Sequence, residues 1–168
     1  MGLRLPGNIP VAAASLGALL RRGRCEGLPK YRLSTALVQF TDDASDPVIV
    51  WASPNLRGYR AVWSAAHDLK AVDEIDTWGK GVDVDHVYPK SWATVAGMEM
   101  AYVRLFPAWG EVNRSAGAGR EKSQLHELQL KPKRVGEIIY ATELQVLKIL
   151  GHPVGTASKP VSIFSRRG

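Results

Sequence analysis

The sequence is poor in cysteine, with Cys25 alone among 168 residues. A single thiol cannot close an internal disulfide, and it cannot supply the cysteine pairs of a zinc ribbon or a zinc knuckle. Both architectures are therefore excluded. A reducing compartment is compatible with the sequence but is not required by it.

Long apolar runs are also missing. The longest candidate, residues 9–20, is interrupted by Pro10, Ser15 and Gly17 and is shorter than the roughly 18 apolar residues of a membrane helix. We therefore expect no membrane partner. Arginines follow this run where a secretory signal would be cleaved, and the arginine-rich N-terminus has few of the serines of a mitochondrial presequence. An N-terminal arm and a cytoplasmic location are favoured, with mitochondrial import and secretion as alternatives.

Acidic residues are in deficit, with 16 Asp and Glu against 22 Lys and Arg, a net charge of +6 and a pI near 9.6. Between Arg104 and Arg134, seven basic residues face three glutamates, whereas residues 68–85 carry six acids and two lysines. Such a segregated excess is typical of proteins that bind polyanions. We expect DNA as the partner, with RNA as an alternative, and leave the oligomeric state open.

The remaining composition, 45% apolar and 23% charged, is that of a globular chain with one core. The apolar periodicity, with proline and glycine as stops, predicts the secondary structure. It predicts a hairpin over residues 34–40 and 47–52, a helix from Ser53 to about Leu69, a strand over residues 82–87 and a helix from Val135 to Leu150. The expected organisation is a basic arm over residues 1–30, one domain over residues 31–151 and a basic tail over residues 152–168.

The densest polar cluster, Asp83-Val84-Asp85-His86, lies on the predicted strand, and Asn113 follows inside the basic stretch. Carboxylate and amide oxygens suit a hard cation such as Mg²⁺, and an imidazole that titrates near neutrality suits the activation of water. Adjacent strand residues point to opposite faces, so we expect Asp85 and His86 to approach a bound phosphate from two sides. The same residues are also compatible with a hydrogen-bonded surface pair and an asparagine that caps a turn.

Two longer segments give this cluster a context: residues 85–92, DHVYPKSW, and residues 105–113, LFPAWGEVN. Together they resemble the bacterial endonuclease I family, in which an acid-His-Val-x-Pro-x-Ser-Trp strand precedes Leu-Phe-Pro-x-x-Gly-x-Val-Asn. The resemblance covers about residues 56–122. It implies an α+β fold with a ββα-metal (His-Me finger) core like that of HNH nucleases, here with an N-terminal hairpin and flanking helices.

The resemblance also implies roles for individual residues. His86 is the general base, while Asp85, where the family usually has glutamate, and Asn113 hold one Mg²⁺ ion, for which Mn²⁺ or Ca²⁺ can substitute in binding. The family usually has two histidines before Leu-Phe-Pro, whereas this chain has Val103 and Arg104. The contribution of those histidines therefore falls to Arg104, as a catalytic residue, or is missing.

Basic residues around the two motifs are the expected phosphate contacts: Lys90, Arg114, Arg120 and Lys122. The sequence thus predicts an endonuclease that hydrolyses DNA phosphodiester bonds with little sequence selectivity, because no base-reading helix or finger array is evident. The alternative is a nucleic-acid-binding or ribonucleoprotein component that keeps the fold without catalysis. The departure at Arg104 favours this alternative, and the presence of Asp85, His86 and Asn113 opposes it.

Overall fold

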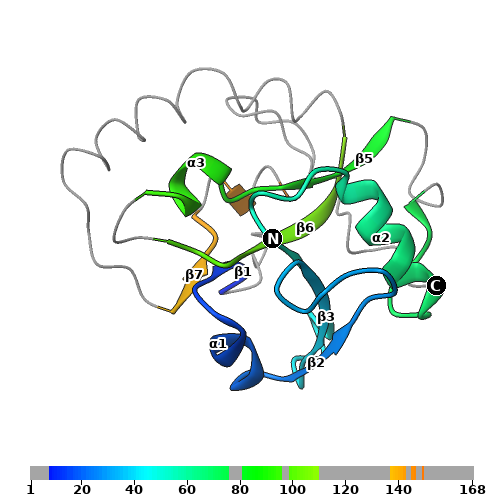
Figure 1. The fold of residues 1–168 in the computed structure, drawn as a ribbon, viewed down its shortest axis with the longest axis horizontal. Coiled ribbons are helices and arrows are strands. Elements are labelled where there is room, and N and C mark those ends of the chain that lie inside the picture. The colour runs from blue at the N-terminus through cyan, green and yellow to red at the C-terminus, as the bar shows by residue number, and fades with distance from the viewer. Residues whose placement is uncertain are drawn as a thin grey trace, which may run out of the picture.

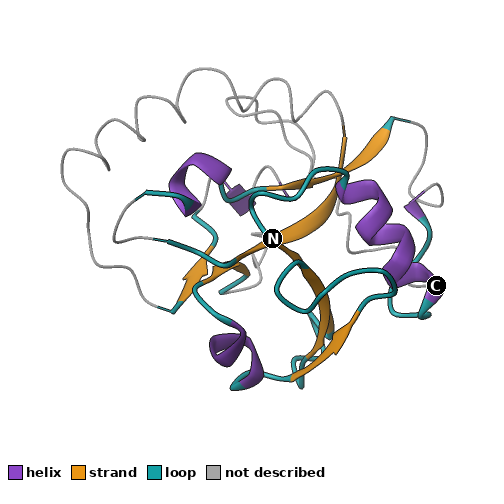
Figure 2. Ribbon diagram, viewed as in Figure 1, coloured by secondary structure: helices purple, strands orange, loops and turns teal. Residues whose placement is uncertain are grey.

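A computed structural model describes residues 8–75, 81–95, 99–109 and 137–142, together with Gln145, Val146 and Ile149. This part of the chain is a mixed α/β fold in which a curled antiparallel sheet carries a few short helices (Figures 1 and 2). No helix within it is both long and apolar enough to cross a membrane. Its elements are β1 (Pro10–Ala13), α1 (Leu16–Leu20), β2 (Arg24–Gly27), β3 (Ala36–Phe40), β4 (Val48–Ala52), α2 (Tyr59–Asp68), β5 (Val82–His86), α3 (Lys90–Ala93), β6 (Tyr102–Trp109) and β7 (Ile138–Tyr140).

The sheet has seven strands in the order β2-β3-β4-β6-β1-β7, with β5 paired to β6 outside this path. The first residues of β6 lie between β4 and β1, where Val103 is opposite Ala52 on one side and Ala12 on the other. The rest of β6, from Leu105 onward, pairs with β5. One strand therefore joins the main sheet to the β5 ladder.

Alternation along the strands places apolar residues on both faces of the sheet. Val38 and Val50 pack with α2, whereas Leu37 and Trp51 face the other way and pack with Leu19 of α1. Figure 1 accordingly shows α2 beside β5 and α1 beside β2. A third cluster, which includes Val103 and Phe106 of β6, lies between β1, β6 and the region of α3.

The predicted hairpin is confirmed. Strands β3 and β4 pair in register from Ala36 opposite Ala52 to Phe40 opposite Val48. In the turn between them the Thr41 hydroxyl donates to the Asp46 carbonyl oxygen at 2.7 Å, and the Thr41 amide donates to the Pro47 carbonyl oxygen. β-branched strands joined by a turn rich in aspartate and serine thus form the predicted structure.

The predicted helix after the hairpin exists but begins later than expected. Ser53 accepts the Leu56 amide in a turn instead of starting the helix. Gly58 then adopts φ +83°, a left-handed conformation that glycine tolerates best, and α2 begins at Tyr59. The positive φ thus fixes Tyr59 as the first residue of the helix.

The prediction of one continuous helix from Val135 is wrong. Residues 138–140 form β7, which pairs antiparallel with β1, and Ala12 is opposite Ile139. Helical residues follow only after Thr142, whose hydroxyl accepts the Gln145 amide while Gln145 Oε1 accepts the Thr142 amide. The edge of β1 offers hydrogen-bond partners to the backbone N–H and C=O groups of this segment. Because Ile138 and Ile139 are β-branched and favour strands, this pairing outweighs the helical spacing of the apolar residues.

The described part of the predicted N-terminal arm belongs to the sheet. Residues 10–27 form β1, α1 and β2, and β1 has strand partners on both sides. Gly23, between α1 and β2, runs so close to β3 that a Cβ atom there would lie 2.1 Å from the Phe40 carbonyl oxygen. Backbone pairing and this close approach fix the segment in place.

A buried ion pair ties β6 to the hairpin turn. The Arg104 guanidinium donates two hydrogen bonds of 2.5 Å to the Asp46 carboxylate and lies 4.5 Å from the Phe106 ring centre. Its side chain is 4% exposed and that of Asp46 is 19% exposed. A buried arginine needs its anionic partner, because removal of that partner leaves an uncompensated charge.

We predict that Asp46→Asn lowers the free energy of unfolding by about 3 kcal/mol, since the amide keeps the shape of the side chain but not its charge. Urea denaturation measures this loss. The matched control is Glu26→Gln, because the Arg24–Glu26 pair is exposed and its loss should cost less than about 1 kcal/mol. Equal effects of the two substitutions would show that burial of the Arg104 pair contributes nothing.

Candidate active site

The candidate site lies at the end of β5, where His86 is opposite Leu105 and Asp85 is opposite Phe106. Val82 and Val84 are buried against α2, and this burial fixes the orientation of β5 on β6. The side chains of Asp85 and His86 are 24% and 17% exposed. The ladder therefore presents an acid and an imidazole that are both partly accessible to solvent.

These two side chains approach each other instead of diverging. His86 Nε2 lies 3.7 Å from Asp85 Oδ1. The ladder is regular through His86, which contacts Tyr59 on the α2 side where Val82 and Val84 are buried. The expected divergence of the two side chains is nevertheless not observed, because their polar ends lie together. A carboxylate at this distance favours the protonated imidazole once it forms.

The hydrogen bonding of His86 fixes which nitrogen can act as a base. Nδ1 lies 2.6 Å from the backbone carbonyl oxygen of Tyr88. A carbonyl oxygen can only accept, so Nδ1 carries the proton of the neutral ring and Nε2 carries the lone pair. The lone pair is thus on the nitrogen that lies on the side of Asp85.

Tyr59, which no sequence pattern indicated, packs edge-on against His86 with ring centres 5.5 Å apart and an interplanar angle of 80°. Its hydroxyl is buried and has no hydrogen-bond partner among the described residues. Burial, with a smaller contribution from the negative charge of Asp85, raises the pKa of Tyr59 to about 12. Tyr59 is therefore uncharged and forms one side of the site. This role was not evident from the sequence, because no spacing motif links Tyr59 to a histidine 27 residues later.

Lys90, one of the expected phosphate contacts, joins the same cluster. Its Nζ lies 4.8 Å from the Tyr59 ring centre and 3.4 Å from the Leu56 carbonyl oxygen. Because Lys90 is the first residue of α3 and is only partly buried, its ammonium group brings positive charge to the region of His86.

The other predicted site residues are not gathered here by the described structure. Arg104 directs its guanidinium to Asp46, which gives this residue a structural role. Asn113, Arg114, Arg120 and Lys122 lie outside the described residues. A ββα-metal core is not shown by the described residues, which contain the antiparallel pair β5 and β6 that carries Asp85 and His86.

The expected metal ligands are likewise described in part. Within the described ranges no group of three or more His, Cys, Asp and Glu side chains could hold a metal ion. Asp85 offers a partly exposed carboxylate, which fits a hard cation, whereas Asp83 lies 3.6 Å from Arg60 in an exposed ion pair. The sequence resemblance implies two protein ligands, Asp85 and Asn113. Of these the structure describes Asp85, whose carboxylate fits the role.

No family model matches the chain, and no curated protein and no solved structure shows significant similarity to it. The likeness to endonuclease I rests on the two sequence motifs alone. The chemistry of the site is therefore argued from His86 and its neighbours.

We predict that neutral His86 is the Nδ1–H tautomer, because its Nδ1 donates to the Tyr88 carbonyl oxygen. Nitrogen-15 chemical shifts of the imidazole ring, measured above its pKa, distinguish the two ring nitrogens. Assignment by comparison with His86→Gln identifies the signals. A protonated Nε2 in the neutral ring would contradict the geometry of the site.

Proposed function

We propose that the protein is a metal-dependent endonuclease that hydrolyses phosphodiester bonds of DNA with little sequence selectivity. The observation that carries the proposal is the orientation of His86, whose Nε2 lone pair lies beside a carboxylate at a partly exposed strand end. The two sequence motifs that contain His86 and Asn113 give the reaction class.

In this proposal His86 Nε2 removes a proton from the water that attacks phosphorus. The Tyr88 carbonyl oxygen keeps the Nδ1–H in place, and Asp85 stabilises the imidazolium that results. Tyr59 packs against the ring and limits its rotation. These three contacts together hold one side chain in the tautomer and orientation that a general base requires.

Asp85 and Asn113 are the residues that would hold Mg²⁺, which when bound supplies a positive charge that stabilises the leaving 3′ oxygen. Lys90 lies near His86 through its contact with Tyr59 and is placed to contact a phosphate. Arg114, Arg120 and Lys122 are the further phosphate contacts that we propose from the sequence. Such contacts carry no sequence information, so we expect cleavage of many sequences and leave RNA as an alternative substrate.

A second candidate is a nucleic-acid-binding or ribonucleoprotein component without catalysis. The pairing of Arg104 with Asp46 favours it, because the residue that stands in place of the family's histidines is occupied in a buried ion pair. The two candidates differ in one property, which is whether bound DNA is cut.

We predict that His86→Ala lowers the rate of Mg²⁺-dependent plasmid nicking by about 10²- to 10⁴-fold, since it removes the general base. Binding to DNA in EDTA should change little, because phosphate contacts remain. The matched control is His67→Ala, because His67 lies on α2 and its Nδ1 lies 3.0 Å from the Val72 carbonyl oxygen. This variant should nick at the parental rate.

The outcomes separate the two candidates. Nicking by the parent that is abolished in EDTA and in His86→Ala supports the nuclease. DNA binding without nicking in any divalent cation supports the binding component. Equal nicking by the parent and His86→Ala would refute the role of His86.

The basic segment should set the salt dependence of DNA binding. Removing one phosphate-binding side chain lowers the slope of log affinity against log salt concentration by about 0.9. The double substitution Arg114→Ala with Arg120→Ala should therefore flatten the slope by roughly two units, measured on duplex DNA in EDTA. Arg57→Ala with Arg24→Ala serves as a control of equal charge at exposed positions outside the segment. An unchanged slope in the first pair would place these arginines away from the DNA.

A further inference from the structure

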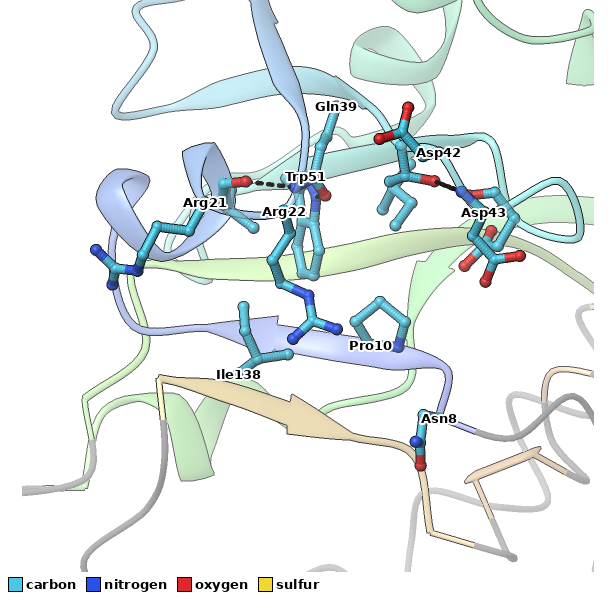
Figure 3. A pocket seen from close by; sticks show the side chains of 13 residues that line it. Asn8, Pro10, Arg21, Arg22, Gln39, Asp42, Asp43, Trp51 and Ile138 are labelled. Atoms are coloured by element: carbon cyan, nitrogen blue, oxygen red, sulfur yellow. Dashed lines mark hydrogen bonds between the residues drawn. The ribbon is translucent and has the colours of Figure 1, made fainter.

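A pocket of about 450 Å³ lies between α1, the β3–β4 turn and the strands β1 and β7 (Figure 3). It is on the face of the sheet opposite α2, because Gln39, Ile49 and Trp51 line it while the alternate residues Val38 and Val50 pack with α2. Tyr59, which contacts His86, belongs to the α2 side. The pocket is therefore separate from the candidate active site, and its volume is within the range of small-molecule sites.

The polar groups in the floor of the pocket are already hydrogen-bonded within the protein. Trp51 Nε1 donates to Gln39 Oε1 at 3.0 Å, and Gln39 Nε2 donates to the Leu19 carbonyl oxygen at 2.7 Å. Trp51 is fully buried and Gln39 is 2% exposed. With Leu19, Ile49 and Ile138 around them, these residues form a floor that suits the apolar part of a ligand.

One end of the pocket is cationic. Figure 3 shows Arg22 extending toward Pro10 and Ile138, while Arg21 points away from them. Arg21 is paired with Glu137, whereas the Arg22 guanidinium lies over the Tyr140 ring and has no ion pair or hydrogen bond within the described residues. The N–H groups of Arg22 are therefore available to an anionic group of a ligand, and the planar guanidinium fits a carboxylate.

The other end is anionic and lies on the β3–β4 turn. Asp46 is paired with Arg104. Asp43 accepts hydrogen bonds from the amide and the hydroxyl of Ser45, which lower the pKa of its carboxyl group, so it stays charged at neutral pH. Asp42 is exposed and makes no ion pair or hydrogen bond in the part of the chain that the structure describes. This end thus offers a carboxylate to a cationic group.

The balance of charge decides the kind of ligand. Two arginines and three aspartates line the pocket, so a dianionic phosphate would meet more negative than positive charge. A molecule with a carboxylate at one end and a cation at the other complements both ends. We propose that this pocket binds a small zwitterion with a cationic side chain, such as a basic amino acid, with its carboxylate on Arg22 and its cation on Asp42 and Asp43.

Four probes test the proposal by titration while the indole N–H signal of Trp51 is followed by NMR. L-arginine carries both charged groups, agmatine lacks the carboxylate, L-citrulline has a neutral ureido group in place of the cationic guanidinium, and guanosine monophosphate tests a nucleotide. We expect L-arginine to bind saturably, and agmatine and L-citrulline to bind about tenfold more weakly, since each of them forms one charged hydrogen bond fewer. We expect no binding of the nucleotide at this signal.

Substitutions test which residue contacts the carboxylate of the ligand and which contacts its cation. Arg22→Gln should weaken L-arginine about tenfold and leave agmatine unchanged, whereas Asp42→Asn should weaken L-arginine and leave L-citrulline unchanged. Arg24→Gln is the matched control, because Arg24 is exposed on β2 and does not line the pocket. Absence of saturation by L-arginine up to about 10 mM, equal effects of Arg22→Gln on L-arginine and agmatine, or preference for the nucleotide would overturn the proposal.

Discussion

The structure depends on the backbone pairing of β6. Its first residues bond to β4 and β1 at once, and its later residues bond to β5. If β6 moved, the main sheet would lose its centre and β5 would lose its only strand partner within the described structure. Pro107 lies in the part of β6 that pairs with β5. Among the described residues, this part of β6 has a strand partner on one side only. A proline, which has no amide proton to donate, is tolerated in such an edge strand. The position of His86 is therefore a consequence of the register of β6.

Local sequence patterns predicted those elements whose partners are close in the chain. The hairpin of β3 and β4 needs only two β-branched runs and a turn, and β5 needs only alternation and a following proline. The start of α2 depended on a positive φ at Gly58, which composition alone does not reveal. Strand β7 pairs with β1, more than 120 residues earlier, and no local pattern reports an edge that distant.

The same distinction applies to the candidate site. Asp85, His86 and Lys90 share one motif and were predicted from it, and the structure gathers them. Tyr59 contacts His86 only because α2 packs against β5, and Asp46 reaches Arg104 only because β4 pairs with β6. Both partners come from tertiary packing. A motif can name the reacting side chain, but the residues that orient it or neutralise it come from elsewhere in the chain.

Strand β2 is the outermost strand at one end of the sheet order, and it has four residues. It carries the exposed Arg24–Glu26 ion pair, and Pro29 follows two residues after its end. An open strand edge can recruit strands of other molecules, but a short edge with charged side chains and a nearby proline is a poor template for such pairing. Among the described strands, this end of the sheet is therefore poorly suited to edge-to-edge pairing with another molecule.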